Sequence, residues 1–409
     1  MIRIGGEYPD SLPSHYLVFA LAKDREMGMI DLGDASEIDS LVAEARRLIY
    51  DAEERVYSPA APYLEERLQE VTGELHRRLI VPVDSFLAGV STLLIAPDGM
   101  LNLLPFEILA TANETYLIEQ YLISYVSSGR DIRGFDSRSV ADGEALIVGD
   151  PDYNHSRTAS PSPDQDNPSL FASADVAAEE REAASRTRGG RDRFTPLQYS
   201  REESQAIASS LRQTNRLTVR EWYGADAGEG NLKGMTDPPY ILHLSTHGYF
   251  TAADLMAGLS GAYNPLLRSG LGLAGANSPP PPALDSMASD DGLLTALEVS
   301  GLNLQGTALV TLSACESGVG APSAGEGVFG LQRAFLHAGA QSLVMSLWRV
   351  PDRETAELMK RFYELWLGGM SRAEALRASA LEILRKSRQE KTHGHPLFWG
   401  GFVLIGNPH

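Results

Sequence analysis

Two segments give the strongest indication of the fold of this chain: YILHLSTHGYF at residues 240–250 and ALVTLSACESGVG at residues 308–320. Each segment is a short apolar run that ends in polar residues, with His247 and Gly248 after the first run and Cys315 after the second. Short apolar runs bounded by turn residues are typical of buried strands. Open parallel sheets present their functional groups where strands end. We therefore expect His247 and Cys315 to lie near each other at one edge of a sheet.

Other short apolar runs predict further strands of the same sheet. They are ALIVGD at 145–150, LTVREW at 217–222, SLVMSLW at 342–348 and GFVLIG at 401–406. The segments 200–212, 327–338, 353–367 and 371–387 fit helices, and Ser371 with Glu374 has the spacing of a capping box. Strands that alternate with helices are typical of a mostly parallel sheet covered on both faces. We expect an α/β/α sandwich over residues 141–409.

Residues 1–140 predict a separate N-terminal module of helices and a β-hairpin. Apolar residues recur at helical spacing from Ala35 to Leu48 and from Pro62 to Arg78. STLLIAPDGMLNLLPFEILA at 91–110 places apolar runs on both sides of a Pro-Asp-Gly turn, which predicts the hairpin. In the second domain, the Ser-, Asp-, Ala- and Arg-rich segment 154–193 and the Pro-rich segment 275–291 are expected to be mobile loops.

The composition excludes several classes of function. The chain has 409 residues, 43% of them hydrophobic, and a formal net charge of -19, which disfavours direct binding to nucleic acid or to anionic lipid. A single cysteine excludes an internal disulfide and any metal site built from several cysteines, so we expect no metal. We find neither a signal-like N-terminus nor the roughly 20 apolar residues that a membrane span needs, which predicts a soluble, cytoplasmic protein.

A cysteine and a histidine at adjacent strand ends suit nucleophilic catalysis. A thiol becomes a good nucleophile when a neighbouring imidazole stabilises the thiolate. The N–H groups of Gly248 and Cys315 are candidates for an oxyanion hole that polarises a scissile carbonyl. Two alternatives stay open: a lone cysteine after an apolar strand can be a small buried hydrophobe, and His243, inside its strand, is interpreted as a core histidine or as a support for the site.

With these motifs in place, the chain resembles the CHAT family of caspase-like peptidase domains, which are often fused to TPR repeats. The resemblance also rests on LLIAPDGMLNLLPFEIL, LIVGDPDY, DGLLTALEV, GEGVFGLQRAFLHAGAQSLVMSLWRVPD and HPLFWGGFVLIGNP. It implies the caspase-hemoglobinase fold of caspases, separase, legumain and gingipains. It further implies a cysteine endopeptidase in which His247 and Cys315 form a catalytic dyad that needs no cofactor.

The resemblance also implies a preference for substrates. SLWRVPD is similar to the separase segment whose acidic residue lines the pocket for a basic side chain, and Asp352 occupies that position. Asp150 is a second candidate wall of this substrate pocket, so cleavage after Arg or Lys is expected. Asp352 as a helix N-cap and Asp150 as a turn residue before Pro151 remain alternatives.

Partners and regulation follow from the same resemblance. The substrate is expected to be a protein or peptide. Because TPR repeats are absent from this sequence, either a free-standing protease or one gated by a separate activating partner fits, and relatives suggest a role in prokaryotic antiviral defence or regulated cell death. The Arg-rich segment Ser185–Phe194 is either a site of self-cleavage or a solvated charged loop. The alternative function is an inactive caspase-like scaffold that binds partners.

Overall fold

The computed structural model describes residues 1–4, 14–56, 58, 61–113, 115–135, 143–156, 193–250, 265–278, 290–317, 324–389 and 394–409. The chain divides into two compact units, one formed by Met1–Val140 together with Val344–His409 and the other by Ala141–Leu343. The division falls inside strand β12 (Ser342–Ser346).

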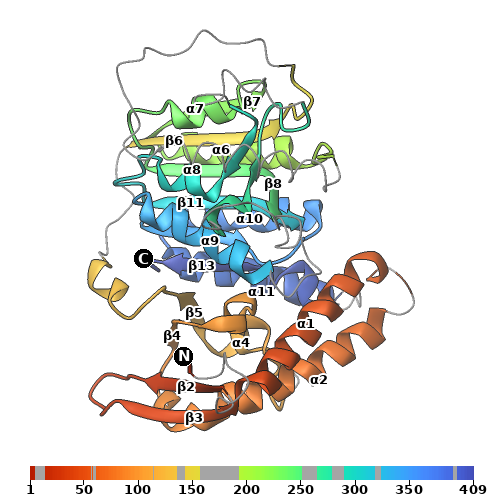
Figure 1. Cartoon of the computed structure of the whole chain (residues 1–409), viewed down its shortest axis with the longest axis vertical. Coiled ribbons are helices and arrows are strands. Elements are labelled where there is room, and N and C mark those ends of the chain that lie inside the picture. Colours follow the sequence, from red (N-terminus) through yellow and green to blue (C-terminus); the bar gives the residue numbers. More distant parts are fainter. Residues whose placement is uncertain are drawn as a thin grey trace, which may run out of the picture. The chain divides into compact units, whose positions relative to one another are not determined.

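In the Ala141–Leu343 unit, the segments that contain His247 and Cys315 each form a strand of a mostly parallel sheet (Figure 1). Strand β8 (Ile241–Phe250) is central, with β11 (Leu309–Ser317) parallel to it on one side and β6 (Gly143–Pro151) parallel on the other. β7 (Leu217–Gly224) continues the sheet beyond β6. β9 (Ser269–Gly272) pairs antiparallel with the last residues of β8, and β10 (Leu293–Thr295) pairs antiparallel with β9.

The strands of this sheet are buried because helices pack against them. In β6 all four residues from Ala145 to Val148 are at most 1% exposed, as expected when both faces of a parallel strand are covered. Helix α6 packs on β6, β7 and β8, and α9 packs on β8 and β9. The described helices of the unit are α6 (Ser200–Gln213), α7 (Glu229–Lys233), α8 (Ala296–Ser300) and α9 (Ala324–His337), with a 3-10 turn at Pro265–Leu267.

The other unit contains a small antiparallel sheet and a pair of long helices. The sheet has the order β1 (Ile2–Ile4), β2 (His15–Ala20) and β3 (Gly28–Asp34). Helices α1 (Ala35–Arg55) and α2 (Ala61–Leu79) pack against each other (Figure 1) through the apolar stripes that the sequence predicted. The side chain of Asp34 caps α1 by accepting a hydrogen bond from Ser36 N–H at 2.7 Å.

The same unit also contains parallel strands. β4 (Thr92–Ile95) pairs with β5 (Leu122–Tyr125), and β5 pairs with β13 (Phe402–Gly406). Helices α10 (Asp352–Leu367) and α11 (Arg372–Gln389) pack on each other. The remaining short elements are α3 (Asp84–Leu87), α4 (Leu117–Gln120) and 3-10 turns at Val81–Val83, Gly99–Leu103, Phe106–Ile108, Asp131–Gly134 and Pro396–Phe398.

The structure confirms the expected α/β class with a mostly parallel sheet. The hairpin predicted over 91–110 is wrong: β4 pairs in parallel with β5, and 3-10 turns follow it over Gly99–Leu103 and Phe106–Ile108. The described antiparallel hairpin of this region is formed by β2 and β3. Local apolar runs flanking a turn cannot distinguish a hairpin from a strand whose partner comes later in the chain.

The two predicted loops lie largely outside the described residues, which resume at Arg193 after the first and at Asp290 before the end of the second. The same is true of most of Ser185–Phe194. Among the helices within the described ranges, none is long and apolar enough to cross a membrane.

Candidate active site

The register of β8 and β11 brings His247 and Cys315 together. The two strands are parallel neighbours, and the Cα of Cys315 is the register partner of the Cα of His247. Neighbouring strands lie about 4.8 Å apart, and side chains alternate between the faces of a sheet along each strand. The backbone therefore places the predicted nucleophile beside its predicted partner, while their catalytic roles remain predictions.

Both strands continue past the positions where the sequence pattern predicted their ends. β8 runs through His247 to Phe250, and β11 runs through Cys315 to Ser317. For β8 the reason is β9, which pairs with it from His247 to Phe250 and provides a sheet partner for this stretch. His247 and Cys315 thus lie within paired strands, which hold the backbone more firmly than a loop would.

The His247 ring is held by a backbone carbonyl. Its Nε2 lies 2.7 Å from the carbonyl oxygen of Thr195. A carbonyl only accepts hydrogen bonds, so Nε2 carries the hydrogen and donates it. In the neutral ring, Nδ1 is then the basic nitrogen. This arrangement orients an imidazole for acid and base chemistry.

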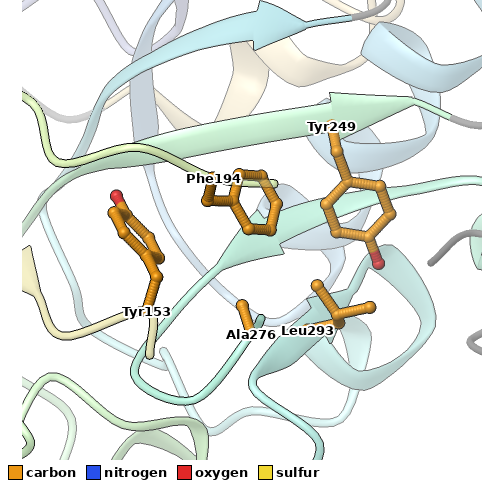
Figure 2. Packing of buried hydrophobic residues seen from close by; sticks show 5 residues of the cluster. All are labelled: Tyr153, Phe194, Tyr249, Ala276 and Leu293. Carbon is orange, nitrogen blue, oxygen red and sulfur yellow. The ribbon is translucent and has the colours of Figure 1, made fainter. Parts of the chain in front are cut away.

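An aromatic cluster supports the same ring. Phe194 stacks on His247 with ring centroids 5.5 Å apart and an interplanar angle of 18°, and Tyr153 lies at 5.5 Å with an angle of 45°. Figure 2 shows Phe194 between Tyr153 and Tyr249, above Ala276 and Leu293, and all five are buried. Gly272 permits this packing, because a Cβ there would lie 2.6 Å from the Phe194 ring. The cluster fixes the plane in which His247 lies.

Gly248, a predicted contributor to the oxyanion hole, is buried in β8 beside His247. Its Cα is in register with Leu271 of β9 and with Glu316 of β11. It therefore adjoins the residue that follows Cys315. An oxyanion hole formed by the N–H groups of Gly248 and Cys315 stays a prediction.

His243 belongs to the core beneath the candidate site, in agreement with the sequence interpretation. It is fully buried, and its Nε2 lies 3.2 Å from Glu203 Oε1 of α6. Glu203 Oε2 also accepts a hydrogen bond from Ser245 Oγ at 3.2 Å. His243, Ser245 and His247 are every second residue of β8, so they lie on the same face of the strand. The contacts of Glu203 therefore tie the strand that carries His247 to α6.

Asp150 has an unusual backbone and a charged partner. It lies at the bulge near the end of β6 with a φ of 45°, a conformation that few residues other than glycine adopt. Its carboxylate forms an ion pair with Arg201 at 2.6 Å, and its N–H donates to Ser200 Oγ at 2.9 Å. Ser200 Oγ in turn donates to the carbonyl of Ser245 in β8. Asp150 is thus tied to β8 through Ser200, and its carboxylate is already paired with Arg201.

Asp352 is the first residue of α10 and belongs to the other unit. Pro351 occupies the N-cap position, and its carbonyl accepts a hydrogen bond from Thr355 N–H at 3.0 Å. The alternative interpretation of Asp352 as the N-cap is therefore wrong. Its carboxylate still favours the helix start, because the first turn of a helix carries partial positive charge. Its role in a substrate pocket stays a prediction.

Sequence reasoning did not identify the residues that hold His247. Thr195 contributes a backbone carbonyl, which every residue possesses, so no sequence signal could have singled it out. Phe194 and Tyr153 are separated from β8 in the sequence, and only the fold brings them to His247. Tyr153 lies in the quoted motif LIVGDPDY and Phe194 ends the Arg-rich segment, but neither was assigned a role.

Metal-binding geometry was also sought in the described ranges. There, no group of three or more His, Cys, Asp and Glu side chains is arranged so that it could hold a metal ion.

The chain resembles known proteins in sequence over a short region. It is 38% identical over 115 residues to Tetratricopeptide repeat protein 28 of Homo sapiens, which is 28% of this chain and 4% of that protein. The Mus musculus protein of the same name is 37% identical over 115 residues, with the same coverage. The match thus spans a small fraction of the length of these curated relatives.

Solved structures with low sequence identity match most of the chain. The Arg-specific cysteine proteinase gingipain R has a TM-score of 0.44 at 10% identity, covering 91% of this chain and 74% of that one. The Saccharomyces cerevisiae separase-securin complex has a TM-score of 0.41 at 12% identity, covering 90% of this chain and 22% of that one.

The family comparison covers most of the sequence. The match to the CHAT domain extends over residues 69–407 and includes β8, β11 and the segments around them. The chain therefore belongs to the CHAT domain family.

Proposed function

We propose that the protein is a cysteine endopeptidase in which Cys315 is the nucleophile and His247 its acid–base partner. The observation that carries this proposal is the register of β8 and β11, which pairs the backbones of these two residues. The contact between His247 Nε2 and the carbonyl of Thr195 adds support, because it makes Nδ1 the basic nitrogen of the neutral ring. Membership of the CHAT family agrees with this chemistry.

In the acylation step, Cys315 transfers its proton to His247 Nδ1, and the thiolate sulfur attacks the carbonyl carbon of the scissile peptide. Negative charge develops on the carbonyl oxygen, where the N–H groups of Gly248 and Cys315 would stabilise it. The imidazolium then gives its proton to the leaving amine as the C–N bond breaks. The carbonyl of Thr195 stabilises the imidazolium while it holds that proton.

In the deacylation step, His247 accepts a proton from water, and the oxygen of that water attacks the thioester carbon. The C–S bond breaks, and the imidazolium gives its proton to the departing sulfur. The acid product is released and the free thiol of Cys315 is restored. Protons are exchanged between Cys315, His247, substrate and water, so the mechanism needs no cofactor.

We propose that a preference for Arg or Lys before the cut rests on an acidic side chain, and the two candidates for it are Asp352 and Asp150. A carboxylate binds a guanidinium through charge-assisted hydrogen bonds that can be bidentate. Asp150 is paired with Arg201, so a substrate cation there would share or displace that partner. For this reason Asp352 carries the larger part of the assignment.

The biological role that we propose is cleavage of a companion protein in a prokaryotic defence or cell-death response. A separate activating partner is the proposed regulator, and the cytoplasm is the proposed compartment. These assignments rest on the resemblance to CHAT proteins and not on the geometry of the site.

The test compares the wild type with Cys315→Ala on a proteome-derived peptide mixture, with cut sites identified by mass spectrometry. The proposal predicts cuts made by the wild type alone and clustered after Arg or Lys. Cuts after other residues would overturn the basic pocket while leaving the peptidase intact. Cuts that persist in Cys315→Ala would refute the nucleophile, and absence of cuts in the presence of candidate activators would favour the scaffold alternative.

A further inference from the structure

The side chain of Asn277 forms hydrogen bonds with both the N–H and the carbonyl group of Phe194. Asn277 Oδ1 accepts a hydrogen bond from Phe194 N–H at 2.9 Å, and Nδ2 donates to the carbonyl of Phe194 at 2.8 Å. Nδ2 also lies 3.1 Å from Asn154 Oδ1. The amide group thereby fixes one residue of another segment as a neighbouring β-strand would.

The backbone of Asn277 is itself anchored next to the aromatic cluster. Its N–H donates to the carbonyl of Tyr153 at 2.8 Å, and the N–H of Gly275 donates to the carbonyl of Asp152 at 2.9 Å. Ser278 Oγ donates to the carbonyl of His155 at 2.8 Å. The segment 275–278 is therefore bonded to the segment 152–155, and the Asn277 side chain adds Phe194 to this pair.

Phe194, which Asn277 holds by these two hydrogen bonds, also contacts His247. The Phe194 ring stacks on the imidazole, and the next carbonyl along the chain, that of Thr195, accepts the hydrogen bond from His247 Nε2. With only two soft torsions per residue, fixing both backbone groups of Phe194 restricts where the Thr195 carbonyl can point. Asn277 thus acts on both contacts that hold the ring.

We propose that Asn277 is a positioning residue for His247. It keeps the Thr195 carbonyl aimed at Nε2, which stabilises the imidazolium and, through it, the Cys315 thiolate. This inference rests on the dyad proposed above. Among the side chains that the structure describes, the titratable ring neighbour of His247 is Tyr153. On the backbone, Cys315 of β11 is the register partner of His247.

The test needs no substrate, because Cys315 is the only cysteine in the chain. The rate of alkylation by iodoacetamide is measured between pH 5 and pH 10 in the full-length wild type, Asn277→Ala and His247→Ala. Alkylation reports the thiolate, so its pH profile gives the apparent pKa of Cys315. We expect Asn277→Ala to shift this profile toward that of His247→Ala and to slow alkylation at pH 6 by about 10-fold, as for a shift of one pKa unit.

Two further variants separate positioning from folding. Asn231→Ala is the matched control, since the exposed Asn231 also donates its amide to a backbone carbonyl, that of Asp226 at 2.8 Å. It should leave the profile unchanged. Asn277→Ser keeps a short polar side chain but cannot bridge both backbone groups of Phe194, so it should show the same shift as Asn277→Ala. Circular dichroism verifies that each variant is folded. If Asn277→Ala does not fold, the pH profile of Asn277→Ser alone tests the inference.

The outcomes are distinguishable. If the wild type and His247→Ala share one profile, the proposed dyad fails and the role of Asn277 fails with it. If those two differ but Asn277→Ala and Asn277→Ser follow the wild type, the dyad stands and the positioning role is refuted. A shift in both Asn277 variants, with Asn231→Ala unchanged, supports the inference.

Discussion

Replacing Glu107 with Gln should remove part of the pH dependence of stability. Glu107 is buried at 7% exposure and accepts a hydrogen bond from the Tyr125 hydroxyl at 2.5 Å. Burial raises the pKa of this carboxyl from its ordinary value of 4.5 to about 7. Between these two values the native protein keeps a proton that the unfolded chain has already released. Stability contributed by Glu107 is therefore lost as pH rises, in contrast to an ion-paired carboxylate.

The magnitude follows from the two pKa values. The linkage relation gives a loss of about 2 to 3 kcal/mol in the free energy of unfolding between pH 5 and pH 8. Glu107→Gln has no proton to lose, so this loss should disappear from the variant. Glu53, whose pKa is also raised to about 7 by burial, stays in both proteins and its contribution cancels in the comparison.

Urea unfolding followed by circular dichroism at pH 5 and pH 8 measures the effect. The quantity compared is the change in unfolding free energy between the two pH values, with equal m-values required in wild type and variant. Glu66→Gln, at an exposed position of α2 in the same unit, is the control and should behave as the wild type. If Glu107→Gln loses as much stability as the wild type on going to pH 8, the reasoning about this buried carboxyl is refuted.

Substitutions at three further positions probe the candidate site and its support. Phe194→Ala should lower the unfolding free energy by about 3 to 5 kcal/mol, because a buried ring is lost. It should also slow alkylation of Cys315 at pH 6. An unchanged midpoint of chemical denaturation would contradict the predicted loss of stability. Glu203→Ala should cost about 1 to 3 kcal/mol, because buried polar groups of His243 and Ser245 lose their contact with this carboxyl group. Glu203→Gln should cost less, and equal midpoints for the two variants would be inconsistent with this network. Asp352→Asn should reduce cleavage after Arg and Lys by about 10-fold or more relative to other cuts, with less than about 1 kcal/mol lost from the start of α10; an unaltered cut-site profile would remove Asp352 from the pocket.

Local pattern predicted much of the fold because the strands and helices are long enough to show their periodicity. Helix α6 was expected over 200–212 and runs over Ser200–Gln213, and α10 was expected over 353–367 and runs over Asp352–Leu367. The hairpin over 91–110 failed because the partner of β4 is β5, a distant segment that pairs in parallel. Pairing of this kind is decided by the tertiary fold and leaves little trace in a short window.

The candidate site divides in the same way. His247 and Cys315 were identifiable because a thiol and an imidazole after buried strands are chemically distinctive, and the register of β8 and β11 brings them together. The groups that hold His247 were not identifiable, because a backbone carbonyl from Thr195 and an amide clamp from Asn277 depend on chain segments that meet only after folding. Asp150 shows a third case, in which a plausible pocket residue has an ion pair with Arg201 that no sequence pattern predicted.

The most direct test of the proposed dyad is covalent trapping with a peptidyl acyloxymethyl ketone that carries Arg next to the reactive group. The labelled protein is digested, and the modified residue is identified by mass spectrometry in the wild type, His247→Ala and Cys315→Ala. The dyad predicts a single adduct on Cys315 in the wild type, a labelling rate lower by about 100-fold or more in His247→Ala, and no adduct in Cys315→Ala. Equal labelling rates in the wild type and His247→Ala, or an adduct on another residue, would contradict it.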